Sequence, residues 1–367
     1  MKNFDIVIVV FNVLNYDARA LNLANSLISL NYKVLVISIK SDIKDNYTFQ
    51  NIEIEVDNTK RMFSKWIDFV FKAYRIIKTL NFKAYIASDL YSLPNIFNLK
   101  NIEITYDSRE IYSALASLKN RKLSQKVITI IEKVFLKKVN KVIVSGELDR
   151  DYLIKRKEFQ KDFYVIKNLP PNVKIKNSNY LRDKYAISNQ HKIAIYQGAI
   201  LNNRGLFPFI EAIADIDDIF FVLVGENSLG NKLSKFINYL DLSDRCKIHP
   251  QVNYRDLLSI TQSADFGISL FEPVSDSYQY ALPNKIFEYL SSGIPYLATN
   301  LPAINLLTKE TEAGILVNNV YNDVELKEKL LELIKKYDKL KKNAEHKMKN
   351  YTYDSQINEI KRLVQYV

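Results

Sequence analysis

The chain of 367 residues is 47% hydrophobic and 25% charged, which is typical of a globular protein and long enough for two domains. Its single cysteine, Cys246, excludes a disulfide framework and a cysteine-rich metal site, and favours a reducing, cytosolic compartment. The net charge of +11 favours an anionic partner: nucleic acid, an acidic membrane surface or a phosphorylated ligand. We expect no membrane-spanning segment, because no apolar run approaches about 18 residues. We expect no signal peptide, because the N-terminus lacks a charged segment followed by an apolar one.

The first part of the chain alternates predicted strands with predicted helices. The apolar run 4–11 is typical of a strand buried on both faces of a parallel sheet, and Asp17 is a good N-cap for the amphipathic helix that follows. This strand–helix–strand opening is Rossmann-like, but the dinucleotide glycine pattern is absent, which argues against NAD or FAD enzymes. Further strands are predicted at 34–39, 52–56, 84–88, 102–106 and 141–145.

A second alternating series begins after the proline-containing segment 168–172, the best linker candidate. Two charged amphipathic helices, 324–347 and 351–366, end the chain, and we expect the last to cross back onto the first domain. These patterns predict an α/β protein with two Rossmann-like doubly wound domains facing a central cleft, 1–172 and 173–350. The strands predicted in the second series are 193–197, 220–225, 246–249, 266–270 and 296–299.

The segment 278–295 is predicted to be a loop followed by a short helix and a helix-terminating turn. Pro283 and Asn284 open the helix, with Pro283 suited to its first turn, and Gly293 can take the left-handed position that ends it. The unpaired N–H groups at its start are a ready anion site. Lys285 and Glu288 share one face, so a cation suited to phosphate lies one turn from a carboxylate suited to a ribose diol. The alternative is a solvated surface pair.

Other predicted strands of the second series end in residues suited to a nucleotide. Arg204 precedes Gly205 at the start of a helix and could hold a phosphate, although a tight turn with a solvated arginine is an equal alternative. We expect the turn after 220–225 to lie near the base or sugar of a bound nucleotide, and the backbone after 246–249 could face its nucleobase. The remaining candidates on this side are Gly198, Gly225, Glu226 and Val252.

Charged residues also follow the strands of the first domain. Because the carboxyl ends of parallel strands share one edge, we expect these residues to face one cleft and bind a ligand. Ion pairing among themselves is the competing explanation, and Asp17 serves first as a helix cap. The residues in question are Asp17, Arg19, Asp89, Tyr91, Asp107, Arg109 and Glu110.

With these motifs in order, the chain resembles the GT-B glycosyltransferases, specifically the large retaining group of family 4, over nearly its whole length. The segment from Gly198 to Gly205 is similar to that family's donor-phosphate loop, and Glu288 to the glutamate that holds the nucleotide ribose. Segments 17–19 and 107–110 resemble first-domain signatures of a subgroup acting on bacterial surface polysaccharides. The resemblance implies an acceptor-binding first domain and a second domain that binds a nucleotide-sugar.

Three positions depart from the family pattern. Tyr280 stands where the family has the first glutamate of a pair, for which Glu272 is a substitute if the loop folds back, and Ala199 stands where an arginine is expected. Residues 1–172 contain no histidine, and Arg109 occupies the position of one. The implied mechanism therefore needs no histidine.

In this mechanism Arg204, Lys285 and the helix N-terminus stabilise the charge that develops on the diphosphate. Asp89, Asp107 or Glu110 would orient the acceptor hydroxyl, which makes Arg204, Lys285, Asp107 and Glu110 the catalytic candidates. We expect no cofactor and no dedicated metal, since Asp215-Ile216-Asp217 precedes a predicted strand and is read as a helix-ending turn.

Two basic stretches of the first domain, 60–78 and 119–141, carry aromatic or apolar residues at helical spacing. Such helices suit an anionic membrane surface, so we expect a cytosolic protein with peripheral contact to the inner membrane face. The alternative is an ordinary core-facing stripe with solvated lysines. No nucleic-acid-binding module is recognisable.

The sequence thus predicts transfer of a sugar from a nucleotide-diphosphate donor to a lipid-linked or polymeric glycan acceptor. One alternative is a nucleotide-sugar epimerase, which needs acidic and histidine groups around the sugar. The other is an inactive GT-B partner subunit that binds glycan, favoured by Tyr280 and Ala199.

Overall fold

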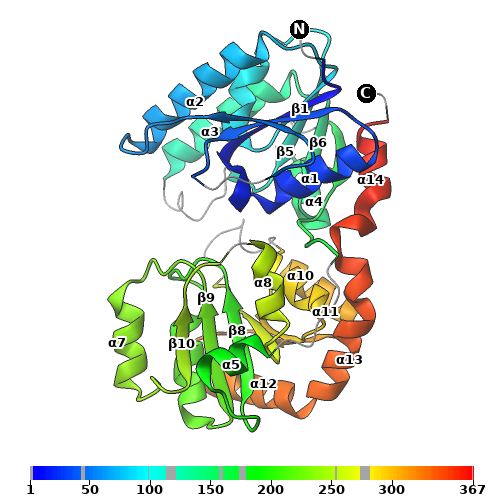
Figure 1. Cartoon of the computed structure of the whole chain (residues 1–367). Helices are drawn as coiled ribbons and strands as arrows, with labels where there is room; N and C mark the ends of the chain where they lie inside the picture. The colour runs from blue at the N-terminus through cyan, green and yellow to red at the C-terminus, as the bar shows by residue number, and fades with distance from the viewer. Residues whose placement is uncertain are drawn as a thin grey trace. The chain divides into compact units, whose positions relative to one another are not determined.

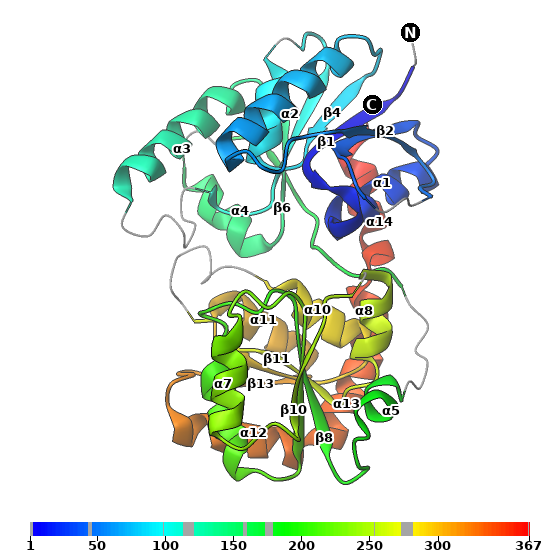
Figure 2. The same cartoon turned by 60° about the vertical axis from the view of Figure 1, so that its left-hand side comes forward.

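The computed structural model describes residues 3–42, 46–97, 99–112, 121–156, 160–172, 179–252, 254–272, 282–365 and 367. The chain divides into two compact units, Met1–Asn168 with Tyr353–Val367, and Leu169–Thr352 (Figures 1 and 2). Each unit is a parallel sheet with helices packed against it, so the predicted fold class, two Rossmann-like doubly wound domains, is confirmed. Among the described helices, none is both long and apolar enough to span a membrane.

The N-terminal unit is built on a seven-stranded sheet in the order β3-β2-β1-β4-β5-β6-β7. Its strands are β1 (Ile6–Val13), β2 (Val34–Ile39), β3 (Gln50–Ile54), β4 (Ala84–Ala87), β5 (Glu103–Ser108), β6 (Lys141–Val144) and β7 (Asp162–Val165). Its helices are η1 (Leu14–Tyr16), α1 (Ala18–Ser29), α2 (Met62–Ile77), η2 (Leu90–Ile96), α3 (Lys122–Leu136), α4 (Glu147–Ile154), η8 (Tyr353–Gln356) and α14 (Ile357–Leu363).

The C-terminal unit is built on a six-stranded sheet in the order β10-β9-β8-β11-β12-β13. Its strands are β8 (Lys192–Gln197), β9 (Ile219–Val224), β10 (Cys246–His249), β11 (Phe266–Ser269), β12 (Tyr296–Thr299) and β13 (Gly314–Val317). Its helices are α5 (Tyr180–Tyr185), α6 (Leu206–Ala212), η6 (Ile213–Asp215), α7 (Asn231–Tyr239), α8 (Tyr254–Thr261), α10 (Asn284–Ser291), α11 (Pro302–Thr311), α12 (Asp323–Lys335), α13 (Tyr337–Lys347) and η7 (Met348–Tyr351).

In both sheets the strand order reverses beside the first strand of the unit, and this determines where a ligand can bind. In the N-terminal unit β1 pairs in parallel with both β2 and β4, and in the C-terminal unit β8 pairs with both β9 and β11. Crossover helices leave in opposite directions at such a point, which opens a crevice at the carboxyl ends of the two strands. The residues after β1 and β4, and after β8 and β11, therefore line the expected ligand edges.

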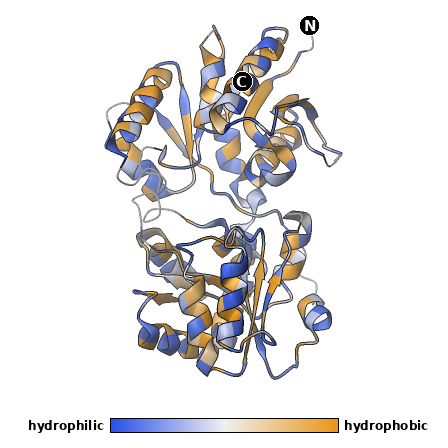
Figure 3. Cartoon of the chain, turned by 90° about the vertical axis from the view of Figure 1, so that its left-hand side faces the viewer, coloured by the Kyte–Doolittle hydropathy of each residue, from blue (hydrophilic) through white to orange (hydrophobic). Residues whose placement is uncertain are grey.

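Apolar runs form the sheet cores because parallel strands are covered on both faces. Ile6, Val7, Ile8, Val9 and Val10 of β1 are fully buried, as predicted, although the strand begins at Ile6 and continues to Val13. In Figure 3 the strands within each unit are mostly orange, whereas the helices alternate orange and blue along their length. The surface helices are thus amphipathic, with a stripe that packs on the sheet.

Four elements differ from the sequence-based expectation. Strands β7 and β13 were missed: β7 is partly exposed and opens with Asp162, and β13 opens with a glycine, so neither shows a long apolar run. The single helix expected at 324–347 breaks at Lys336 into α12 and α13, and α13 packs against α10 and α11. The helix expected at 351–366 is two 3-10 turns followed by α14.

Candidate functional site

The glycines after β8 and β9 let two strand ends approach closely. Gly225 has φ of +149°, and a Cβ there would lie 2.1 Å from the carbonyl oxygen of Gly198. Gly205, with φ of +62°, precedes the first residue of α6, and its Cβ would lie 2.5 Å from the Leu270 side chain. Both close approaches need glycine. They bring the loop that carries Arg204 next to the end of β11.

Helix α10 begins at this same edge. Pro283 precedes its first residue, Asn284, with ψ of 131°, so Pro283 is the cap and not part of the first turn. Gly293 follows the helix with φ of +70°, as expected for a left-handed C-terminal position. Lys285 and Glu288 are 8% and 7% exposed, which rules out the solvated surface pair that was the alternative.

Lys285 is a buried cation held by aromatic rings. Its ammonium lies 3.7 Å from the ring centre of Tyr196 and 5.1 Å from that of Phe271. The Arg204 guanidinium lies 4.3 Å from the same Phe271 ring. Within the described part of the chain, no hydrogen bond or ion pair reaches the Lys285 ammonium.

The electrostatics around Arg204 and Lys285 favour an anion between them. Burial first, and then the positive charge of Arg204, hold the pKa of Lys285 well below its usual range, while Glu288 acts in the opposite direction. An anion placed between Arg204 and Lys285 would relieve both effects, because an opposite charge favours the ionised form. The N-terminus of α10 adds backbone N–H groups to the same place.

Glu288 lies one turn beyond Lys285. Its Oε2 accepts a hydrogen bond from the side-chain amide of Gln197, whose Oε1 in turn accepts from Thr261 at 2.6 Å. Burial raises the pKa of Glu288, and the bond from Gln197 and the charge of Lys285 oppose this. Neither Gln197 nor Thr261 was predicted. A polar residue at the end of an apolar strand, directly before Gly198, was the available signal for Gln197.

The other predicted donor-side residues lie around this edge. Gly198 is next to Lys285, since a Cβ on Gly198 would lie 3.9 Å from the ammonium. Glu226 is exposed and Val252 half-buried after their strands. The backbone N–H of Glu272 donates to the Asn203 carbonyl at 3.3 Å, which places Glu272 beside the Arg204 loop. Tyr280, and the segment 278–281 of the predicted loop, fall outside the described residues.

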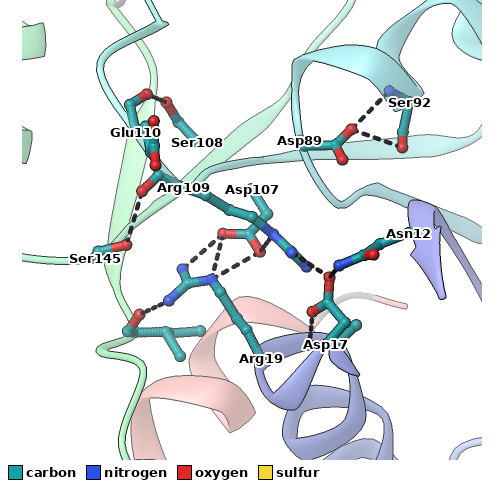
Figure 4. A network of polar contacts seen from close by, with 12 residues as sticks. Asn12, Asp17, Arg19, Asp89, Ser92, Asp107, Ser108, Arg109, Glu110 and Ser145 are labelled. Carbon is teal, nitrogen blue, oxygen red and sulfur yellow. Dashed lines mark hydrogen bonds and ion pairs between the residues drawn. The ribbon is translucent and has the colours of Figure 1, made fainter. Parts of the chain in front are cut away.

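In the N-terminal unit the predicted charged residues pair with one another (Figure 4). The Arg19 guanidinium donates to Asp107 from Nε at 2.9 Å and from Nη2 at 2.6 Å, and to the Ile166 carbonyl from Nη1 at 2.7 Å. Arg109 donates to Asp17 at 2.6 Å, and Asp17 also caps α1 through the Ala20 N–H. The competing explanation, ion pairing, therefore holds for this network.

This geometry gives two of the predicted residues a structural role. Arg19 and Asp107 are 5% and 1% exposed and hydrogen-bonded to each other, so they connect α1 to the end of β5. The ligand contact of Arg19 and the catalytic role of Asp107 stay predictions. Arg109 is more open, with 19% of its side chain exposed, and its buried Nη2 has no hydrogen-bond partner in the described residues.

Asp89, which follows β4 at this edge, combines a strained backbone with a buried carboxylate. It has φ of +128°, and its Oδ1 accepts from the Ser92 N–H at 2.8 Å and from the Ser92 hydroxyl at 2.9 Å. Burial raises its pKa to about 7, opposed mainly by Arg109. Strained backbone conformations cluster at functional sites. Tyr91 is 41% exposed after the same strand, and Glu110 is exposed after β5.

Asp149 on α4 is a further carboxylate with a shifted pKa, and the sequence pattern did not predict it. Burial raises its pKa to about 7, with Arg19 lowering it and Glu147 and Glu110 raising it. No strand-end pattern marks this residue, because it lies inside a helix.

Across the described residues, no group of His, Cys, Asp or Glu is arranged to hold a metal ion. Asp215 instead pairs with Lys327 at 2.6 Å, and Asp217 lies 3.8 Å from Arg245.

Residues 177–354 match the family model described as "Glycosyl transferases group 1". The matched segment is just under half of the chain and is similar to that family. It contains β8, α10 and every residue placed at the candidate anion site, so the site lies within the matched segment.

A curated relative is similar to part of the chain in sequence, and solved structures are similar to it in fold. The chain is 24% identical over 212 residues, 53% of its length, to chitobiosyldiphosphodolichol beta-mannosyltransferase of Candida albicans, and it spans only 45% of that relative. The structure superposes on sucrose-phosphate synthase of Thermosynechococcus elongatus with a TM-score of 0.79 at 15% identity, covering 99% of this chain and 98% of that chain. It superposes on HepE of Anabaena, in complex with UDP and glucose, with a TM-score of 0.76 at 14% identity and full coverage of both chains. These two likenesses are likenesses of fold.

Proposed function

We propose that this protein is a retaining glycosyltransferase that takes a sugar from a nucleotide-diphosphate donor. The observation that carries the proposal is Lys285, a buried ammonium without an ion-pair partner in the described residues, next to Arg204 at the N-terminus of α10. Glu288, one turn on, supplies an acceptor for ribose hydroxyls. Gly198, Gly205, Gly225, Glu226, Val252, Pro283 and Asn284 would line the rest of the donor site.

The proposed chemistry follows from that charge arrangement. The bond between the anomeric carbon and the diphosphate oxygen breaks, and its electron pair stays with the diphosphate, whose growing charge Arg204 and Lys285 stabilise. The acceptor oxygen bonds to the anomeric carbon from the same face, and its proton passes to the departing phosphate. This step needs no histidine and no metal ion.

We propose a lipid-linked or polymeric glycan in bacterial surface polysaccharide synthesis as the acceptor. The N-terminal unit would bind it through Asp89, Tyr91, Arg109 and Glu110. Asp89 has a raised pKa and a strained backbone, and Arg109 has an unpaired donor nitrogen in the described structure. These are groups that can orient a hydroxyl.

Titration calorimetry of the full chain with UDP, GDP, ADP and CDP tests the donor proposal. We expect one of them to bind with a dissociation constant in the range of about 1 µM to 1 mM, which is usual for enzyme substrates. Turnover of the matching nucleotide-sugar would exclude the inactive partner subunit, and release of the free nucleoside diphosphate with sugar transfer would exclude the epimerase. Absence of binding to all four would refute the proposal.

We further propose that α2 and α3 contact an anionic membrane surface. Both helices contact η2 and bury part of their apolar residues in one core cluster (Figures 1 and 2). Their remaining apolar side chains are exposed, including Phe63 at 67%, Phe71 at 59%, Leu123 at 77% and Ile130 at 60%. A purely core-facing stripe does not account for these. Exposed basic residues on or directly after the helices are Lys72, Arg75, Lys78, Lys122, Lys126, Lys133, Lys137 and Lys138.

Sedimentation with lipid vesicles should show binding that requires anionic lipid and weakens at high salt. Basic residues contribute about 1 kcal/mol each near such a surface, and this attraction is screened by salt. Phe63→Ser with Phe71→Ser should lower the bound fraction several-fold. Tyr239→Ser, at an 83% exposed position on α7, is the matched control. Binding that ignores lipid charge would contradict the proposal.

A further inference from the structure

The side chain of Gln197 joins two helices beneath the candidate donor site. Gln197 ends β8 and is 1% exposed, Thr261 ends α8 and is fully buried, and Glu288 lies on α10 at 7% exposure. The Gln197 amide bonds to Glu288 on one side and to Thr261 on the other. Three separate elements of the C-terminal unit therefore meet at one amide.

The chemistry of the groups fixes the direction of each bond. An ionised carboxylate can only accept, so the amide NH₂ of Gln197 must face Glu288. The amide oxygen then faces Thr261, whose hydroxyl must donate to it, at 2.6 Å. The Thr261 hydroxyl also lies within donating distance of the Leu257 carbonyl, at 2.8 Å, so its single proton is shared between the two oxygens and the shorter contact is the one to Gln197. The relay thus runs from Thr261 through Gln197 to Glu288.

The relay leaves Glu288 with one occupied and one available oxygen. In the described structure Gln197 is the sole hydrogen-bond donor to this carboxylate, and it binds Oε2. A carboxylate has lone pairs for further donors on its second oxygen. Donation to Oε2 also stabilises the ionised form, which burial disfavours. A carboxylate that is fixed through one oxygen and has no donor on the other within the described residues is suited to two neighbouring hydroxyl groups.

We propose that Gln197, held by Thr261, is a positioning residue that orients Glu288 to accept hydrogen bonds from the ribose hydroxyls of the donor nucleotide. The inference rests on the proposed function, because it requires a ribonucleoside diphosphate at this site. It makes ribose recognition depend on a buried amide that does not touch the ligand. A relay with a structural role only would affect the fold and not the choice of sugar.

The test measures discrimination between a ribonucleoside diphosphate and its 2′-deoxy form by calorimetry. The probes are UDP, GDP, ADP and CDP, each with its 2′-deoxy counterpart, and the full chain is used. For the nucleotide that binds, we expect the wild type to prefer the ribose form about tenfold or more, since a hydrogen bond to a charged group contributes about 1.5–3 kcal/mol. Gln197→Met should bring this ratio to about 2 or below, with the affinity for the deoxy form unchanged within about twofold.

Variants at Thr261 keep the test decisive if Gln197→Met folds poorly. Thr261→Val removes the donor without changing the shape and should lower the ratio, whereas Thr261→Ser should retain it. Three outcomes would overturn the inference and leave the donor proposal standing. They are an unchanged ratio in Gln197→Met or Thr261→Val, an equal loss of affinity for the ribose and deoxy forms, and a wild type that does not discriminate between the two forms. A wild type that binds none of the nucleotides would overturn both.

Discussion

Lys285→Met should weaken binding of the cognate nucleoside diphosphate about 10- to 150-fold, because a hydrogen bond to a charged phosphate is lost at a cost of about 1.5–3 kcal/mol. The same change should leave the melting temperature equal or higher. In the free protein Lys285 is 8% exposed, and its ammonium is close to Arg204 and has no ion-pair partner in the described residues. Methionine fills similar space among the rings of Tyr196 and Phe271 without a desolvated charge.

Calorimetric titration and a thermal melt, performed on the same preparation, check both halves of this prediction. Lys235→Met on α7 is the control, since this exposed lysine of the same unit lies outside the site, and it should bind like the wild type. Retained affinity in Lys285→Met would remove Lys285 from the donor site. A clear fall in melting temperature would show that Lys285 stabilises the fold, against our reading of its environment.

Asp107→Asn should destabilise the N-terminal unit by about 3–5 kcal/mol, the usual cost of leaving one partner of a buried ion pair alone. Asp107 is 1% exposed and receives three hydrogen bonds from Arg19, which is itself 5% exposed. Without the carboxylate the guanidinium keeps only the Ile166 carbonyl among these partners. Arg19→Met with Asp107→Leu should recover part of the loss, because neither member of the Arg19–Asp107 pair is then left as an unpaired buried charge.

Urea unfolding followed by tryptophan fluorescence measures this effect selectively. The only tryptophan of the chain is Trp66, on α2 of the N-terminal unit, so its signal reports that unit. Glu359→Gln is the control, because its partner Arg362 is 68% exposed and such pairs contribute about 0–1 kcal/mol. A loss below about 1 kcal/mol in Asp107→Asn would mean that the pair is more hydrated than its burial indicates.

The two arginines of the N-terminal unit show how similar sequence signals can separate in the structure. Arg19 and Arg109 both follow strands and both lie next to carboxylates in the predicted cleft. Arg19 makes its bonds to Asp107 and Ile166 in the interior, whereas Arg109 keeps a buried donor nitrogen without a partner in the described residues. We therefore retain Arg109 as an acceptor-side proposal and assign Arg19 to the fold.

The sequence by itself determined the strand–helix alternation and the candidate helix α10. Parallel strands covered on both faces require continuous apolar runs, so β2, β10 and β12 were predicted with their exact ends. The three-residue spacing of Lys285 and Glu288 similarly places them on one helical face by local geometry. The strands β7 and β13 were not predicted, because they are short and do not form long apolar runs.

Only the tertiary structure decided which of these residues are buried and what they contact. Arg19 and Asp107 are 88 residues apart, and Gln197 lies 64 residues from Thr261 and 91 from Glu288. Lys285 is a buried cation because rings from β8 and from the segment after β11 enclose it. Burial and charge pairing depend on neighbours that the sheet order brings together, and no local pattern in the sequence records that order.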